Sequence, residues 1–89
     1  MVAGTLDELR AKLIFQNSMD VWIILCREKN WDRRDYLRYT QFIKYLREQR
    51  VQLNKAPQGH PIKDSEGKPV ETYVIRLDNT MIQKIRSFT

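Results

Sequence analysis

The stretch TQFIKYLREQRVQLNKAPQGHPIKDSEGKPVETYVIRL, residues 40–77, decides the fold of this chain. Its first ten residues combine helical apolar spacing with basic side chains, which predicts an amphipathic helix over residues 40–49. Residues 50–53 and 72–77 instead alternate apolar and polar side chains, as strands do. Between them, residues 54–69 are polar and broken by Gly and Pro, which excludes a continuous strand. The stretch therefore predicts a helix followed by a β-hairpin with a long tip.

The preceding segment, residues 5–29, predicts two helices. A Thr-x-x-Glu capping box that begins at Thr5 starts the first helix. A polar break at Asn17 and Ser18 can cap a second helix that is apolar on most sides and ends near Lys29. One unbroken helix over the whole segment is the alternative interpretation.

The next segment, residues 32–49, has two interpretations. It can form one helix with a continuous apolar stripe. Alternatively, a short helix capped by Asp32 ends near Arg38, the chain turns at Tyr39, and Thr40 caps a new helix. We favour the second interpretation because Thr is a good N-cap. It is also the only interpretation that gives a helix-turn-helix within the segment.

A final short helix is predicted within residues 79–88, capped by Asp78 or Asn79. Its apolar side consists of Met81, Ile85 and Phe88. This side can pack on the chain's own core or form a seam between two copies, and we expect a homodimer that uses it.

The bulk composition indicates one small domain that binds a polyanion. The 89 residues are 42% hydrophobic and 30% charged, which favours a folded single domain over residues 1–89. The net charge is +5, but the four basic and four acidic side chains of residues 1–31 cancel. All of the excess positive charge therefore lies in residues 32–89, together with the predicted helix and hairpin.

Several other classes of protein find no support in the sequence. Cys26 is the only cysteine and lies in an apolar run, so we expect it in the core and expect no intrachain disulfide. His60 is the only histidine, and nothing in the sequence points to a Ser or Cys that partners it, so we expect no enzyme, metal or cofactor. There is no signal-peptide pattern, and the longest apolar run is too short to span a bilayer. We therefore expect a cytoplasmic protein without a membrane partner.

The strongest candidates for a functional site are basic and polar side chains. On the helix over residues 40–49, one side carries Thr40, Gln41, Lys44 and Arg47. Gln can bond adenine through two hydrogen bonds, and Lys or Arg can bond guanine. Candidates for phosphate contacts flank them: Arg33, Arg34, Arg38, Arg50, Lys55, Lys63 and Lys68. A charged stripe opposite an apolar one is also what any solvated helix shows.

Residues of about 18–77 resemble a small winged helix-turn-helix domain of the kind found in prokaryotic, phage, plasmid and archaeal-virus regulators. The resemblance implies an α+β fold with three to four helices, a two-stranded wing over residues 50–77 and a short C-terminal helix. It places Thr40, Gln41, Lys44 and Arg47 at base-facing positions, and Lys55, Lys63 and Lys68 on the wing. The chain departs from the pattern because no Gly marks the turn and because the wing tip has about sixteen residues.

We therefore expect a protein that binds double-stranded DNA, as a small dimeric transcriptional regulator whose affinity falls steeply with salt. The main alternative is a protein-interaction module, viral or from a phage, that docks on a host protein or on transcription or replication machinery. A binder of structured RNA is the third hypothesis.

Overall fold

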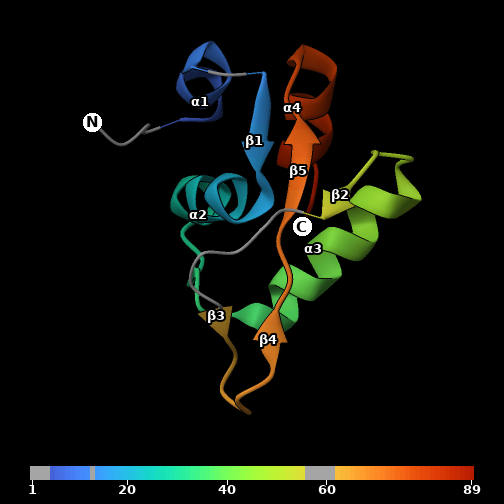
Figure 1. Cartoon of the computed structure of the whole chain (residues 1–89). Helices are drawn as coiled ribbons and strands as arrows, with labels where there is room; N and C mark the ends of the chain where they lie inside the picture. The colour runs from blue at the N-terminus through green and yellow to red at the C-terminus, as the bar shows by residue number, and fades with distance from the viewer. Residues whose placement is uncertain (1–4, 13, 56–61) are drawn as a thin grey trace.

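A computed structural model describes residues 5–12, 14–55 and 62–89 (Figure 1). These residues form a compact α+β fold with four helices, a three-stranded antiparallel sheet and a separate two-stranded hairpin. In chain order the elements are α1 (Leu6–Lys12), β1 (Phe15–Asn17), α2 (Ser18–Lys29), α3 (Tyr36–Glu48), β2 (Asn54–Lys55), β3 (Ile62–Lys63), β4 (Pro69–Val70), β5 (Tyr73–Arg76) and α4 (Asn79–Arg86).

The three-stranded sheet brings a strand from the N-terminal part of the chain beside strands from its C-terminal half. β5 is the central strand, with β1 and β2 paired antiparallel on either side (Figure 1). Gln16 lies opposite Ile75, and Asn54 lies opposite Val74. The sequence did not predict β1, because three residues without clear alternation show their strand character only once β5 is beside them.

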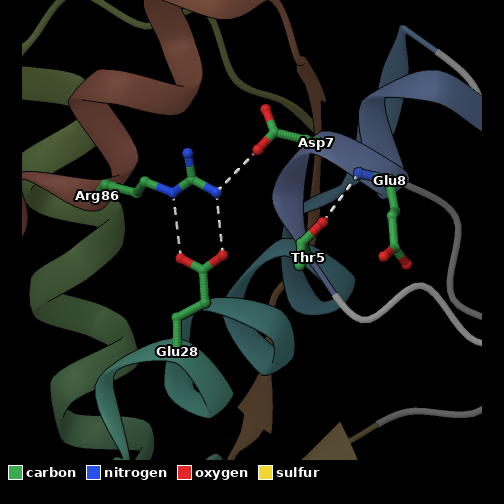
Figure 2. Close-up of polar contacts among 5 residues, drawn as sticks. All are labelled: Thr5, Asp7, Glu8, Glu28 and Arg86. Atoms are coloured by element: carbon green, nitrogen blue, oxygen red, sulfur yellow. Dashed lines mark hydrogen bonds and ion pairs between the residues drawn. The ribbon is translucent and has the colours of Figure 1, made fainter.

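Short polar side chains start three of the helices, as the sequence predicted. The Thr5 hydroxyl accepts a hydrogen bond from the backbone N–H of Glu8 at 3.1 Å (Figure 2). The Asn17 side chain caps α2, and the Asp78 side chain caps α4. The break at Asn17 is thus confirmed, and the alternative of one unbroken helix is wrong.

The prediction of two helices within residues 32–49 is wrong, because α3 is a single helix. Its N-cap is Asp35, whose carboxylate accepts a hydrogen bond from the backbone N–H of Arg38 at 3.1 Å. The Thr40 hydroxyl instead donates to the carbonyl of Tyr36 at 2.9 Å, as a threonine inside a helix does. Thr40 is therefore compatible with either interpretation, as an N-cap or as a residue inside a helix. The unbroken apolar stripe of residues 32–49 indicated the correct one, a single helix.

A short connection over residues 30–35 joins α2 to α3. α2 ends at Asn30, whose φ of 59° is left-handed, a conformation that Asn adopts more readily than most residues. Asp32, which we predicted to cap a helix, instead accepts a hydrogen bond from the backbone N–H of Arg34 at 2.9 Å. Asp32 thus stabilises the turn that precedes α3.

The wing region differs from the predicted simple hairpin. β2 begins at Asn54, after the predicted strand over residues 50–53, and pairs with β5 as expected. A second ladder, β3 with β4, lies within the region predicted as a polar tip (Figure 1). The predicted turn at its end is confirmed: Gly67 has a φ of 79° and donates to the carbonyl of Asp64 at 3.0 Å.

The core is built from buried side chains of all four helices and of strands β4 and β5. Trp22 is its centre: the side chain is 0% exposed, and its ring lies 5.4 Å from that of Phe42 and 6.5 Å from that of Phe88. Cys26 is buried, as predicted, and burial raises the pKa of its thiol to about 12. Within the described residues, no helix is long and apolar enough to cross a membrane.

The apolar side of α4 packs on this core, which is the alternative to a dimer seam that the sequence left open. Ile85 is 0% exposed and Phe88 is 7% exposed, and the Phe88 ring contacts those of Trp31 and Tyr45. Met81 is partly buried against the same core. Within one copy, the core therefore covers Ile85 and Phe88, and Met81 is the member of this side that stays partly exposed.

Hydrogen bonds from one arginine, Arg86, to two carboxylates connect α4 to α1 and α2 (Figure 2). The Arg86 guanidinium donates two hydrogen bonds to the Glu28 carboxylate of α2, at 3.1 and 3.2 Å. A third hydrogen bond, at 3.2 Å, reaches the carboxylate of Asp7 in α1. We call these three residues the Arg86 cluster.

Candidate nucleic-acid interface

The structure places all four predicted base-facing residues on the exposed side of α3. Thr40, Gln41, Lys44 and Arg47 are exposed, whereas the opposite side buries Tyr39, Phe42, Ile43 and Leu46. The helical period explains this division, because the buried positions recur every three to four residues. We call the exposed side the outer face of α3.

A groove of about 870 Å³ lies between α3 and the β3–β4 hairpin. Its lining includes apolar atoms from Ile43 on α3 and from Pro69 and Val70 on the hairpin. Its charged lining residues are equal in number: Arg34, Lys44, Arg47 and Lys68 against Asp35, Asp64, Glu66 and Glu71. The groove as a whole is therefore not a positively charged channel, although Arg34 and Lys44 in its lining have no acidic partner among the described residues.

A chain of polar contacts crosses one side of the groove. Arg47 donates to the Tyr73 hydroxyl at 3.1 Å, and its guanidinium lies 5.2 Å from the centre of that ring. The Tyr73 hydroxyl donates to Glu71 at 2.9 Å, and Lys55 lies 3.5 Å from the same carboxylate. The hydrogen bond from Tyr73, followed by the charge of Lys55, lowers the pKa of Glu71. Arg47 and Lys55 are thus partly occupied within the fold.

A buried set of hydroxyls fixes the hairpin against the helices. The hydroxyls of Ser18 and Tyr39 lie 2.9 Å apart, and Tyr39 donates to the carbonyl of Glu71 at 2.8 Å. Ser18 also accepts from the backbone N–H of Tyr73 at 2.9 Å. Burial raises the pKa of Tyr39 to about 12, so this hydroxyl keeps its proton. Sequence reasoning missed this set because its members lie far apart in the chain.

The predicted phosphate contacts around α3 divide into free and occupied side chains. Arg33 and Arg34 lie exposed in the connection before α3, and Arg50 lies exposed after it. Arg38 is partly buried: it lies 3.7 Å from the Asp35 carboxylate and 4.5 Å from the centre of the Trp31 ring. Arg38 therefore has a structural role that the sequence did not reveal.

The wing lysines also divide in this way. Lys68 lies 3.5 Å from Glu66, and Lys55 pairs with Glu71, whereas Lys63 has no acidic partner among the described residues. Across the part of the chain that the structure describes, the basic predicted DNA contacts with neither an acidic partner nor a side-chain hydrogen bond are Arg33, Arg34, Lys44, Arg50 and Lys63.

Leu37 is an apolar member of the outer face that the sequence analysis did not single out. It is 74% exposed and lies in the first turn of α3, one turn before Gln41. Its position off the buried stripe was the available signal, because Tyr36 and Tyr39 already define that stripe. The other large exposed apolar side chains among the described residues are Ile14 and Phe15, at β1.

No known protein provides a guide to this site. Comparisons with protein-family models, curated proteins and solved structures found no match. Among the described residues, no three His, Cys, Asp or Glu side chains are arranged to hold a metal ion. His60 lies outside the described residues.

Proposed function

We propose that this chain is a winged helix-turn-helix domain that binds double-stranded DNA through the outer face of α3, as a small dimeric transcriptional regulator. The observation that carries the proposal is the shared exposure of Thr40, Gln41, Lys44 and Arg47 on a helix whose other side is buried. A helix anchored in this way can enter the major groove without any loss of core packing.

The order of the elements supports this proposal. α2 and α3 follow each other across a short turn, so α2 takes the place of the first helix of the motif and α3 that of the recognition helix. β2 and β5 pair directly, and the chain between them carries the β3–β4 hairpin beside α3 (Figure 1). On this proposal, the hairpin is the wing that contacts the DNA backbone.

The charges around α3 support a phosphate-binding role. Arg33 and Arg34 precede the helix, Lys44 lies on its outer face, and Arg50 follows it, all without acidic partners among the described residues. A positive charge that has no partner within the fold is available to replace the counterions around DNA. The ion pairs of Lys55 with Glu71 and of Lys68 with Glu66 reduce the contribution expected from these two lysines.

Fluorescence anisotropy with a labelled random duplex tests the proposal. We expect binding at low salt, with a log–log salt slope of about −3 to −5 if about four or five phosphates are neutralised. Competition with duplex RNA separates DNA binding from the RNA hypothesis, and sedimentation with and without the duplex measures the dimer. Folded protein that binds no duplex at low salt would contradict the proposal.

A second candidate function, docking on a protein, is favoured by the groove beside α3. Its balanced charges and its apolar lining at Ile43, Pro69 and Val70 suit a polypeptide better than a uniformly negative phosphate backbone. The double variant Lys44→Glu with Arg47→Glu distinguishes the two functions. Loss of DNA binding supports the first function, whereas loss of a protein partner in a pull-down without any DNA binding by the wild type supports the second.

A further inference from the structure

We infer that Leu37 and Gln41 together read an A·T base pair step in the major groove, with Leu37 against a thymine methyl group and Gln41 on a neighbouring adenine. This inference rests on the proposed DNA binding and adds a ligand class to it: duplexes with thymine and adenine at the centre of the recognised site.

The first ground is the position of the two side chains. Leu37 lies in the first turn of α3, and Gln41 lies four residues later, so the two side chains are neighbours on the same exposed side. The N-terminal residues of a recognition helix are the ones that reach base edges. Leu37 and Gln41 therefore occupy the part of α3 that enters deepest into the groove.

The second ground is the exposure of Leu37. A leucine that leaves 74% of its surface in water contributes little to the core. The core contacts of this part of α3 are made by Tyr39, which is buried, and by Tyr36, which is partly buried. Leu37 also lines the groove beside the β3–β4 hairpin, but it can be removed without opening a cavity in the core, so its main apolar contact is left to a partner outside the chain.

The third ground is the chemistry of the major groove. Its only apolar group is the C5-methyl of thymine, which apolar side chains contact, whereas the glutamine amide matches the N6 and N7 of adenine. The pair Leu37 and Gln41 therefore matches A·T base pairs. Guanine would instead be read by Lys44 or Arg47, which lie further along α3.

The charges near Leu37 agree with this placement. Arg33 and Arg34 lie just before the first turn of α3 and have no acidic partner among the described residues. Contacts from these arginines to phosphates would fix the register of the helix start on the duplex. Lys44 continues the same exposed side, one turn beyond Gln41 and two turns beyond Leu37.

The test uses DNA in which single groups are removed. The preferred duplex is first selected from a randomised pool with the full chain, and its thymines are then replaced by deoxyuridine, which lacks only the methyl group. We expect the wild type to bind the deoxyuridine duplex about fourfold more weakly, the change expected for one buried methyl. Leu37→Ala should bind the two duplexes equally, with an unchanged salt slope.

Two further variants make the test specific. Gln41→Ala should lose about fivefold or more of the preference for adenine over 7-deaza-adenine, which lacks the N7 acceptor. Phe15→Ala removes another exposed apolar side chain, at β1, and should leave the effect of deoxyuridine unchanged. Circular dichroism verifies that each variant is folded.

The possible failures are distinguishable. Equal binding of thymine and deoxyuridine duplexes by the wild type overturns this inference and leaves the proposed DNA binding intact. A methyl effect that persists in Leu37→Ala also overturns it, because another residue then contacts the methyl. Absence of binding to every duplex at low salt overturns the proposed function together with this inference.

Discussion

The Arg86 cluster and the outer face of α3 use positive charge in opposite ways. Arg86 is enclosed by the carboxylates of Glu28 and Asp7, and so it ties α4 to α2 and α1 (Figure 2). Lys44, on α3, has no acidic partner among the described residues. The Arg86 cluster uses its charge to hold helices together, whereas α3 leaves its charge available for a partner.

This difference refines what the net charge of +5 means. The sequence placed the excess charge in residues 32–89, but Arg86, Arg38, Lys55 and Lys68 all have acidic neighbours. The available positive charge is concentrated before, on and after α3. A stability measurement and a binding measurement should therefore respond to different residues.

The largest effect expected on the folding side comes from Trp22→Ala. Trp22 is fully buried, and its indole N–H donates to the carbonyl of Arg33 at 3.0 Å, which fixes the connection before α3. We expect a loss of about 3–5 kcal/mol in the free energy of unfolding, enough to unfold much of so small a domain. Urea denaturation measures it, with the partly exposed Trp31→Ala as the milder control. A loss below about 1 kcal/mol would contradict the assigned core.

On the binding side, Lys44→Glu should weaken duplex binding about tenfold at low salt and reduce the salt slope by about one. Its free energy of unfolding should stay within about 0.5 kcal/mol of wild type, because Lys44 is exposed and unpaired. Arg10→Glu makes the same charge change on α1 and serves as the matched control. Equal losses of affinity in the two variants would show that net charge, and not α3, governs binding.

The reverse pattern is expected for Arg86→Ala. Loss of its hydrogen bonds to Glu28 and Asp7 should cost about 1 kcal/mol of unfolding free energy, since the partly exposed pairs are screened by solvent. Duplex affinity should not change while the protein is folded. Arg86→Lys should recover only part of the stability, because an ammonium cannot form the paired contact with Glu28. A clear loss of DNA affinity in either variant would show that the Arg86 cluster also takes part in binding, and would contradict the assignment of binding to the outer face of α3.

At Arg50, the backbone conformation should affect stability, whereas the charge of the side chain should affect DNA binding. Its φ of 61° is left-handed, and it follows the last turn of α3, a position that favours Gly. Arg50→Gly should raise the free energy of unfolding by about 0.5–1 kcal/mol and weaken duplex binding. Arg50→Ala should weaken binding equally without the gain in stability. Thermal denaturation measures the stability of both variants, and anisotropy measures their binding. A lower melting temperature for Arg50→Gly than for the wild type would contradict this prediction.

The smallest effect concerns acid titration at the groove. The Tyr73 hydroxyl and then Lys55 lower the pKa of Glu71, so the ionised form is favoured in the folded state. The resulting stabilisation is present above the ordinary carboxyl pKa and is lost as the pH falls through the lowered one. Tyr73→Phe should raise the pKa of Glu71 toward its ordinary value in an NMR titration. An unchanged pKa in that variant would rule out the hydroxyl as the main cause.

Local chemistry in the sequence predicted the parts of the fold that are stabilised locally. The cap at Asn17, the cap at Asp78 and the turn from Asp64 to Gly67 each depend on side chains within four residues of one another. The exposed face of α3 followed from helical periodicity even though its predicted start at Thr40 was wrong. Such features need no information from distant parts of the chain.

Features that depend on distant residues were missed. β1 pairs with β5 some sixty residues later, and Ser18 meets Tyr39 and Tyr73 only after folding. The ion pairs that occupy Arg86 and Lys55 likewise join separate elements. For this reason, the total charge of residues 32–89 could be predicted from the sequence, but which of the positive side chains have acidic partners could not.

The most direct test of the central claim is an NMR titration of the ¹⁵N-labelled chain with a duplex at low salt. We predict that the largest amide shifts fall at Arg33, Arg34, Leu37, Gln41 and Lys44, while Asp7, Glu28 and Arg86 stay nearly unchanged. Shifts centred on the Arg86 cluster, or no shifts at all with the protein folded, would contradict the assignment of α3 as the DNA-binding face.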